Sequence, residues 1–352
     1  MASITASEAL IGQGGDFNGK NYSGTFIPTL WSAKLLKKFY TATVLGEVTN
    51  TDYGGEIKNM GDKVVINTIP TLTINAYEIG TSLTYEVPTP STLEMTIDKG
   101  FYFAFQINDV LAHQSQPNLM DTFSNDASMQ LKIKTDSTVL YNGTLGSGNI
   151  ASANKGATAG VKSGSYNLGT DDSPLALDAS NVLQTITAMA SVLDEQNIPD
   201  SERFLIIDPV TRQLLLSSNL AQAQFMGDSQ SVLRNGRIGG IDRFTVYVSN
   251  NLPRAAAGTN TAWASGDGSE TSITSTGDDK RRVIVAGHKS WLAYATQLTK
   301  MESVRNPSDF GDYVRCLQVF GYKAVQPKAA AVAVVKAEKQ SKEVCRVKQA
   351  LL

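Results

Sequence analysis

The sequence predicts an α+β fold, in which strands and helices are mixed rather than arranged as regular βαβ units. Apolar and polar residues alternate in residues 92–98 and 244–248, as in strands with one covered face. Apolar residues recur every three to four positions in residues 119–141 and 182–193, as in amphipathic helices. The chain has 352 residues, enough for about two domains. Only 18% of them are charged, below the usual figure of about 25%, which indicates a surface that packs against other protein.

The N-terminal part of the chain predicts a flexible arm followed by a long hairpin. Residues 1–30 are rich in Gly, Ser, Asn and Thr and hold too few apolar residues for a core, whereas residues 29–40 suit a short amphipathic helix. Between residues 56 and 105 the period of two predicts the arms of a hairpin. Its distal part, residues 71–87, is apolar, so it either folds back onto its own domain or lies on a neighbouring subunit.

A long helix is predicted next. Residues 119–141 contain no Gly or Pro and would form a rod about 35 Å long. Asn142-Gly143 is typical of a left-handed helix stop. The low-complexity residues 144–173 then predict an exposed loop.

A second compact region begins with the amphipathic helix at residues 182–193. Residues 203–207 predict a buried strand, and Asp208-Pro209 supplies the N-cap and first residue of a helix that extends to about residue 218. Strand patterns return at residues 283–286 and 291–296.

Residues able to carry chemistry are scarce. The two histidines, His113 and His288, lie in no metal-binding motif, and Cys316 and Cys345 are too few for a disulfide framework. We find no G-x-S-x-G turn, phosphate-binding loop or secretory signal. The net charge of −2 excludes a protein that neutralises many phosphates, and no apolar run is long enough to span a membrane. The sequence therefore predicts neither an enzyme nor a bound metal or cofactor.

Three stretches share motifs with a known family. Residues 107–143 end in the pattern Asp136-x-x-x-Leu140-x-Asn142-Gly143. Residues 204–253 begin with Phe204-Leu205-Ile206-Ile207-Asp208-Pro209, and residues 302–321 contain Phe310-Gly311-Asp312-Tyr313-Val314-Arg315. In their order and spacing, these stretches resemble the major capsid protein of tailed bacteriophages, and the likeness extends over residues 30–335.

The resemblance implies a tailed-phage major capsid protein fold with an N-arm, an E-loop hairpin, a peripheral domain with a long spine helix, and an axial domain. The expected bounds are 1–50 for the N-terminal arm, 51–100 for the E-loop, 101–145 and 296–327 for the peripheral domain with its spine helix at 119–141, 146–295 and 328–340 for the axial domain, and 341–352 for a basic C-terminal tail.

The same resemblance implies a structural role. The chain would assemble into hexamers and pentamers of an icosahedral phage head that encloses double-stranded DNA without reading its sequence. Its location would be the virion, after assembly in the host cytoplasm. The implied partners are many copies of itself, a portal at one vertex and a separate scaffolding protein, because no long charged helical segment precedes the arm. Binding of a decoration protein stays open.

The E-loop is expected to lie across a neighbouring subunit, where apolar burial outweighs ion pairing. Some family members cross-link subunits through an E-loop lysine, but residues 64–98 contain no Lys or Arg, so that chemistry is not expected. The loop carboxylates, which include Glu94 and Asp98, would meet basic groups of the neighbour. The candidate contact residues are Leu72, Ile74, Tyr77, Glu78, Ile79, Leu83, Tyr85 and Glu86 on the loop, with Lys34, Lys37, Lys38, Lys132 and Lys134 as basic partners.

Three other functions stay open at this point. An encapsulin-type nanocompartment would share the fold and package protein cargo; nucleic acid inside purified particles and a portal vertex would favour a phage head. A Thr/Ser/Gly-rich surface adhesin would need export. An enzyme with an unrecognised site would show turnover as a monomer.

Overall fold

The structure is a computed structural model of residues 1–352, and all the residues it describes belong to one compact unit, Phe39–Leu352. None of the described helices is both long enough and apolar enough to cross a membrane. The described residues are 43–52, 63–70, 72–80, 82–109, 119–218, 240–255, 263–264, 281–307 and 309–337.

The larger of three sheets has eight strands in the order β4-β13-β10-β5-β7-β6, with β8 beside β10 and β9 beside β8. β5 and β7 are parallel, as are β13 and β4, and the other neighbours are antiparallel. The bounds are β4 Leu175–Leu177, β5 Arg203–Ile207, β6 Gly240–Ile241, β7 Phe244–Val248, β8 Arg254–Ala255, β9 Trp263–Ala264, β10 Arg281–His288 and β13 Ala330–Ala337.

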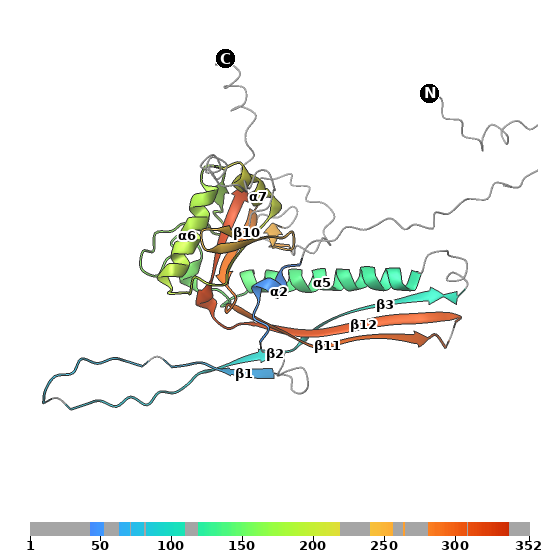
Figure 1. The fold of residues 1–352 in the computed structure, drawn as a ribbon, viewed down its shortest axis with the longest axis horizontal. Coiled ribbons are helices and arrows are strands. Elements are labelled where there is room, and N and C mark those ends of the chain that lie inside the picture. The colour runs from blue at the N-terminus through green and yellow to red at the C-terminus, as the bar shows by residue number, and fades with distance from the viewer. Residues whose placement is uncertain are drawn as a thin grey trace, which may run out of the picture. The chain divides into compact units, whose positions relative to one another are not determined.

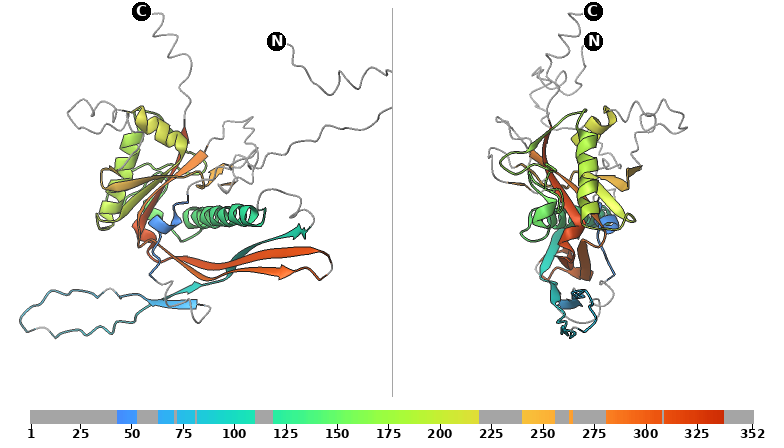
Figure 2. Two further views of the ribbon diagram at one scale, coloured as in Figure 1. Left: turned by 45° about the vertical axis from the view of Figure 1, so that its right-hand side comes forward. Right: turned by 90° about the vertical axis from the view of Figure 1, so that its left-hand side faces the viewer.

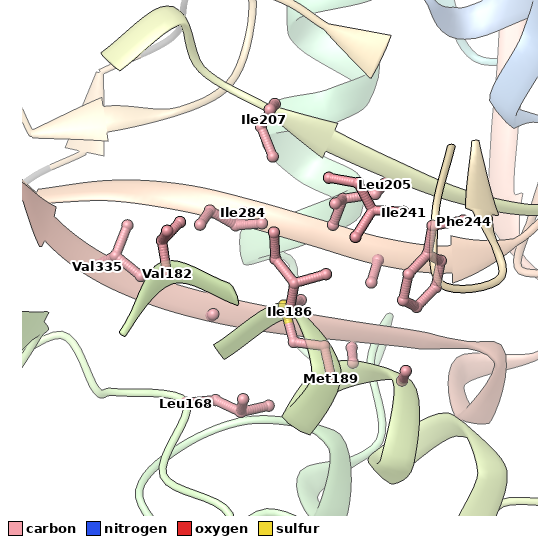
Figure 3. Close-up of a cluster of buried hydrophobic side chains, with 14 of the residues drawn as sticks. Leu168, Val182, Ile186, Met189, Leu205, Ile207, Ile241, Phe244, Ile284 and Val335 are labelled. Atoms are coloured by element: carbon pink, nitrogen blue, oxygen red, sulfur yellow. The ribbon is translucent and has the colours of Figure 1, made fainter. Parts of the chain in front are cut away.

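Both faces of this sheet are covered. Helix α6 (Val182–Glu195) packs on one face, where Ile186 and Met189 meet Leu205 and Ile284 (Figure 3). Helix α7 (Pro209–Leu216) adds Leu215 to the same cluster. The opposite face packs against α2 (Leu45–Val48) and the end of the long helix α5 (Leu119–Leu145). Burial on both faces explains why every residue of β5 is buried, as its continuous apolar run predicted.

A three-stranded antiparallel sheet lies beside α5 (Figures 1 and 2). Its strands, in the order β11-β12-β3, are long and cross from the body of the molecule to a distal tip. Phe105 of β3 meets Phe123 of α5 edge to face, with ring centroids 6.1 Å apart. The strand bounds are β3 Lys99–Asn108, β11 Leu292–Arg305 and β12 Gly311–Ala324, and two short 3₁₀ turns lie at Ser152–Asn154 and Pro327–Ala329.

The predicted long helix is confirmed, but its predicted end is wrong. α5 continues through Asn142 and Gly143 to Leu145, and a glycine with positive φ comes only at Gly148. Gly143 serves packing, because a Cβ at this position would lie 3.3 Å from the Trp291 ring. The 27 residues of α5 give a rod of about 40 Å.

Residues 144–173 form the exposed loop that their composition predicted only in part, because residues 161–165 and 171–173 are exposed but others are buried. Leu168 is fully buried, and its carbonyl accepts a hydrogen bond from Val334 N of strand β13 at 2.8 Å. The side-chain amide of Asn154, also fully buried, donates to the carbonyls of Lys328 and Ala330. The segment lies along β13, where Lys155 forms a bridge with Val332, and Gly169 permits the close approach because a Cβ there would clash with the Val334 carbonyl oxygen.

The predicted hairpin is shorter than expected. β1 (Lys63–Asn67) pairs with β2 (Thr92–Thr96). The chain beyond β2 enters the three-stranded sheet as β3, because Phe101 to Ile107 pair with β12.

Helix α7 is confirmed with its Asp208 cap, which accepts hydrogen bonds from Val210 N and Thr211 N, although it ends at Leu216. Residues 1–42 of the arm, which include the helix expected at residues 29–40, and the tail at 341–352 lie outside the described residues.

Candidate subunit-contact surface

The base of the hairpin is a regular antiparallel ladder. β1 and β2 pair from Lys63↔Thr96 to Asn67↔Thr92, and the Lys63 ammonium lies 3.2 Å from the Glu94 carboxylate. Beyond the last pair, Thr68 N donates to the Ser91 carbonyl at 2.8 Å. The ladder ends there.

The distal loop, which we define as residues 72–90, forms no strand. In the part that the structure describes it has no ladder partner, Ile79 and Gly80 lie in a turn, and Thr73 N donates to the Glu86 carboxylate at 3.1 Å. Ile74 and Ile79 are 92% and 94% exposed. The other large exposed apolar side chains of the loop are Leu72, Tyr77, Leu83, Tyr85 and Val87.

This exposure argues against one of the two placements that the sequence predicted, in which the loop folds back onto its own domain. Within the described chain the distal loop does not fold back onto its own domain, and Figure 1 shows it extending away from both larger sheets. Burying one Ile, Leu or aromatic side chain is worth about 1.5–3 kcal/mol. The loop thus has the composition and the geometry of a surface that gains free energy on meeting another protein surface.

The loop is fixed at its base. Met95 of β2 is fully buried against Ala293 and Ala295 of β11. Gly321 of β12 lies so close to β2 that a Cβ there would lie 2.3 Å from the Thr96 carbonyl oxygen. Side-chain packing therefore sets the direction in which the hairpin leaves the body.

The structure describes only some of the lysines predicted to pair with the loop carboxylates. Lys132 and Lys134 are exposed on α5, whereas Lys34, Lys37 and Lys38 lie outside the described residues. The two loop carboxylates nearest the base have partners within the chain, because Glu94 pairs with Lys63 and Asp98 with Lys99 at 2.8 Å. The hydrogen bond from Lys99 lowers the pKa of Asp98. Glu78 and Glu86 are therefore the carboxylates that lie on the distal loop itself.

The structure also shows an exposed apolar face that we did not predict. On the three-stranded sheet, Tyr102 pairs in register with Leu317, and Tyr313 with Val304, and all four are exposed. Phe310 at the turn between β11 and β12 is exposed too. The signal was available in β3, where Tyr102 alternates with three phenylalanines that face the other way.

The Asp136 motif lies at a junction of three segments. The Asp136 side chain is buried in α5, and its Oδ1 accepts hydrogen bonds from Val44 N at 3.1 Å and Leu45 N at 2.9 Å. Its Oδ2 accepts from Asn251 Nδ2 at 2.6 Å. Burial raises the pKa of this carboxyl group. Asp136 therefore ties the point where the N-terminal segment enters the body to the long helix and to the loop after β7.

Groups that could support catalysis or metal binding are not clustered in the part of the chain that the structure describes. No set of three or more His, Cys, Asp or Glu side chains there has the geometry of a metal site. His288 Nδ1 lies 2.8 Å from Ser290 Oγ, and burial lowers the pKa of its imidazole. Burial also raises the pKa of the Cys316 thiol. His113 and Cys345 lie outside the described residues.

Comparison with known proteins identifies a family that this chain matches. Residues 90–333 match a family described as phage capsid protein. No curated protein sequence matches the chain.

Solved structures of phage proteins share the fold. A chain from Mycobacterium phage Che8 is 24% identical, with 88% of this chain and 97% of that one covered and a TM-score of 0.67. A chain from the capsid of Cyanophage P-SCSP1u is 16% identical, with 91% and 97% covered and a TM-score of 0.63. The mature capsid of bacteriophage PhiM1 gives 16% identity, 91% and 95% coverage and a TM-score of 0.59.

Proposed function

This chain belongs to the phage capsid protein family, as a major capsid protein with a structural role in the virion shell, and we propose that it assembles through its distal loop. In this proposal, hexamers and pentamers form an icosahedral head, and the distal loop of each copy lies on a neighbouring copy. The observation that carries the proposal is the exposure of the loop's apolar side chains, in a segment whose described residues belong to no sheet.

The energetics favour apolar contacts over ion pairs at this interface. Seven large apolar side chains of the loop are exposed, whereas an exposed ion pair contributes only about 0–1 kcal/mol. Glu78 and Glu86 then set the register against a basic surface of the neighbour, for which Lys132 and Lys134 on α5 and Lys34, Lys37 and Lys38 in the arm are candidates. No Lys or Arg occurs in residues 64–98, so the loop makes no lysine cross-link.

The proposed domain organisation is the one that the family implies. We propose an arm at residues 1–50, an E-loop centred on the distal loop, a peripheral domain built from α5 and the three-stranded sheet, and an axial domain built around the eight-stranded sheet. Assembly takes place in the host cytoplasm on a separate scaffolding protein, with a portal at one vertex, and the finished shell encloses double-stranded DNA. The role is assembly and not catalysis.

The test removes the contact and keeps the fold. Replacing residues 72–86 with a short Gly-Ser turn should leave a folded subunit with unchanged far-UV circular dichroism that forms no shells by electron microscopy. A second variant, with Ile74, Tyr77, Ile79 and Tyr85 changed to Ser, should fail in the same way. Its matched control changes the polar loop residues Asn75, Thr84 and Thr89 to Ser and should form normal shells.

Normal particles from the deletion variant would refute the role of the distal loop. The DNA content is tested separately, because nuclease-protected double-stranded DNA in particles from infected cells is expected, and a protein cargo in its place would favour a nanocompartment.

A further inference from the structure

Two arginines lie side by side at the edge of the large sheet. Arg254 of β8 is paired in register with Arg282 of β10, and since opposite residues of an antiparallel pair share a face, both side chains lie on the same side. Both line a recess of about 20 Å³ that is partly open to the surface, so a group can enter it from outside. The rest of the lining is Asp208, Ser249, Asn250, Leu252, Pro253 and Val283.

The recess has more positive charge and more donors than it has acceptors. Its carboxylate, Asp208, accepts hydrogen bonds from Val210 N and Thr211 N at the start of α7, and its Oδ2 lies 2.6 Å from Arg282 Nη1. Asp208 therefore balances Arg282. Arg254 has no carboxylate partner among the described residues, so within that part of the chain the recess has one positive charge more than it has negative charges.

The two arginines also have hydrogen-bond donors without a partner among the described residues. The Nε atoms of both Arg254 and Arg282 are buried, and neither has a partner within the described chain. Buried N–H groups are almost always paired with protein, water or a ligand. A guanidinium presents its N–H groups as a planar fork that matches the two oxygens of a carboxylate.

We propose that this recess binds one carboxylate side chain, an Asp or Glu of a neighbouring copy of this chain. The charge of the recess suits a single carboxylate, and the buried residues Leu252 and Pro253 form an apolar part of its wall. DNA phosphates are the less suitable ligand, because a protein that grips DNA neutralises many phosphates at once, and here the described residues leave an excess of one positive charge in a chain of net charge −2. The identity of the occupant rests on the proposed function, since it requires neighbouring copies.

The first experiment uses free subunits and does not depend on shells. Sodium acetate, titrated into ¹⁵N-labelled subunit, should shift the Nε–Hε signals of Arg254 and Arg282 saturably, and the shift of Arg282 should be lost in Arg254→Gln. Inorganic phosphate and a short DNA duplex are the comparison probes. Absence of a saturable acetate shift would mean that the recess holds water only, and a duplex that shifts the two signals more strongly than acetate would make it a DNA contact; either result overturns the proposal.

The second experiment uses assembled shells. Arg254→Gln shells should dissociate roughly tenfold faster in guanidinium chloride than wild-type shells, because a charge-assisted contact is lost from each copy. Arg254→Lys, which keeps the charge but not the fork, should fall between the two. The control Lys323→Gln removes one exposed charge from β12 and should behave as wild type. Shells of Arg254→Gln that match this control would overturn the proposal, whereas failure of wild-type subunits to form shells would overturn the proposed function.

Discussion

Strand β5 and the distal loop both contain Ile, Leu and aromatic side chains, but these side chains are buried in β5 and exposed in the loop. Every residue of β5 is buried, between α6 on one face of the sheet and α2 and α5 on the other. In the described part of the distal loop every residue is exposed, and the backbone has no ladder partner. Apolar composition alone therefore does not say where burial takes place: the partners of β5 lie in the same chain, and we propose that those of the loop lie in the next copy.

The largest effect on the stability of the subunit is expected in the sheet. Leu205→Ala removes a fully buried side chain that α6 covers, so it should lower the free energy of unfolding of the subunit by about 2–5 kcal/mol. Urea unfolding of unassembled subunit, followed by circular dichroism, measures the change. The matched variant Leu83→Ala in the distal loop should have almost no effect in the same assay, and an equal loss in both would remove the distinction between the two regions.

Asp136 is a polar residue whose hydrogen-bond partners lie in its own chain, so its loss should destabilise the free subunit, as a loss in β5 does. Asp136→Ala removes the acceptor for Val44 N, Leu45 N and Asn251 Nδ2 and should cost about 1–3 kcal/mol. Thermal unfolding of the subunit is the measurement. An unchanged melting temperature would show that the N-terminal segment is not anchored at this carboxylate.

The same residue predicts a pH dependence. Burial holds the pKa of Asp136 above its ordinary value of 3.8, so over the range just above pH 3.8 the folded protein keeps a proton that the unfolded chain has released. The contribution of this group to stability therefore falls as the pH rises from 3.8 through the folded pKa, and is constant above it.

Asp136→Asn isolates this effect, because the other carboxylates are common to both proteins. The unfolding free energy of wild type minus that of Asp136→Asn should decrease with rising pH across this window. A difference that rises with pH would mean that the hydrogen bonds to the carboxylate outweigh its burial.

At the base of the hairpin, the boundary between the two regions, the expected effect is small. Glu94→Gln breaks the exposed pair with Lys63 and should change the unfolding free energy by about 0–1 kcal/mol, with the difference disappearing in high salt. Urea unfolding at low and high ionic strength measures it. A larger, salt-independent loss would show that the pair fixes the hairpin.

The sequence predicted the elements whose signal is local. The step of three to four in α6, the apolar run of β5 and the Asp208-Pro209 start of α7 each depend on neighbours within a few positions. The predicted end of α5 was wrong, and the predicted exposure of residues 144–173 was right only in part, because contacts distant in sequence decide both. Gly143 stays helical against Trp291, and Leu168 is buried against β13.

The candidate surface was predictable only in part. The apolar residues of the distal loop were named from composition, and their exposure is seen in the structure. Pairing of Glu94 with Lys63 and Asp98 with Lys99 depends on strand register, and the exposed face around Tyr102 and Leu317 depends on which side of the three-stranded sheet α5 covers. Neither register nor coverage follows from the alternation of residues within one strand.

Ile79→Ser is expected to have the smallest effect on the stability of the free subunit and a clear effect on assembly. Ile79 is 94% exposed, so Ile79→Ser should change the unfolding free energy of the free subunit by no more than about 0.5 kcal/mol. If the side chain is buried on a neighbouring copy, each contact loses about 1.5–3 kcal/mol, and the protein concentration needed for assembly rises. Sedimentation of shells against free subunits measures this threshold, with Thr84→Ser as the matched loop control. A destabilised subunit that assembles at the normal concentration would place the partner of Ile79 in its own chain and would reverse the comparison with β5.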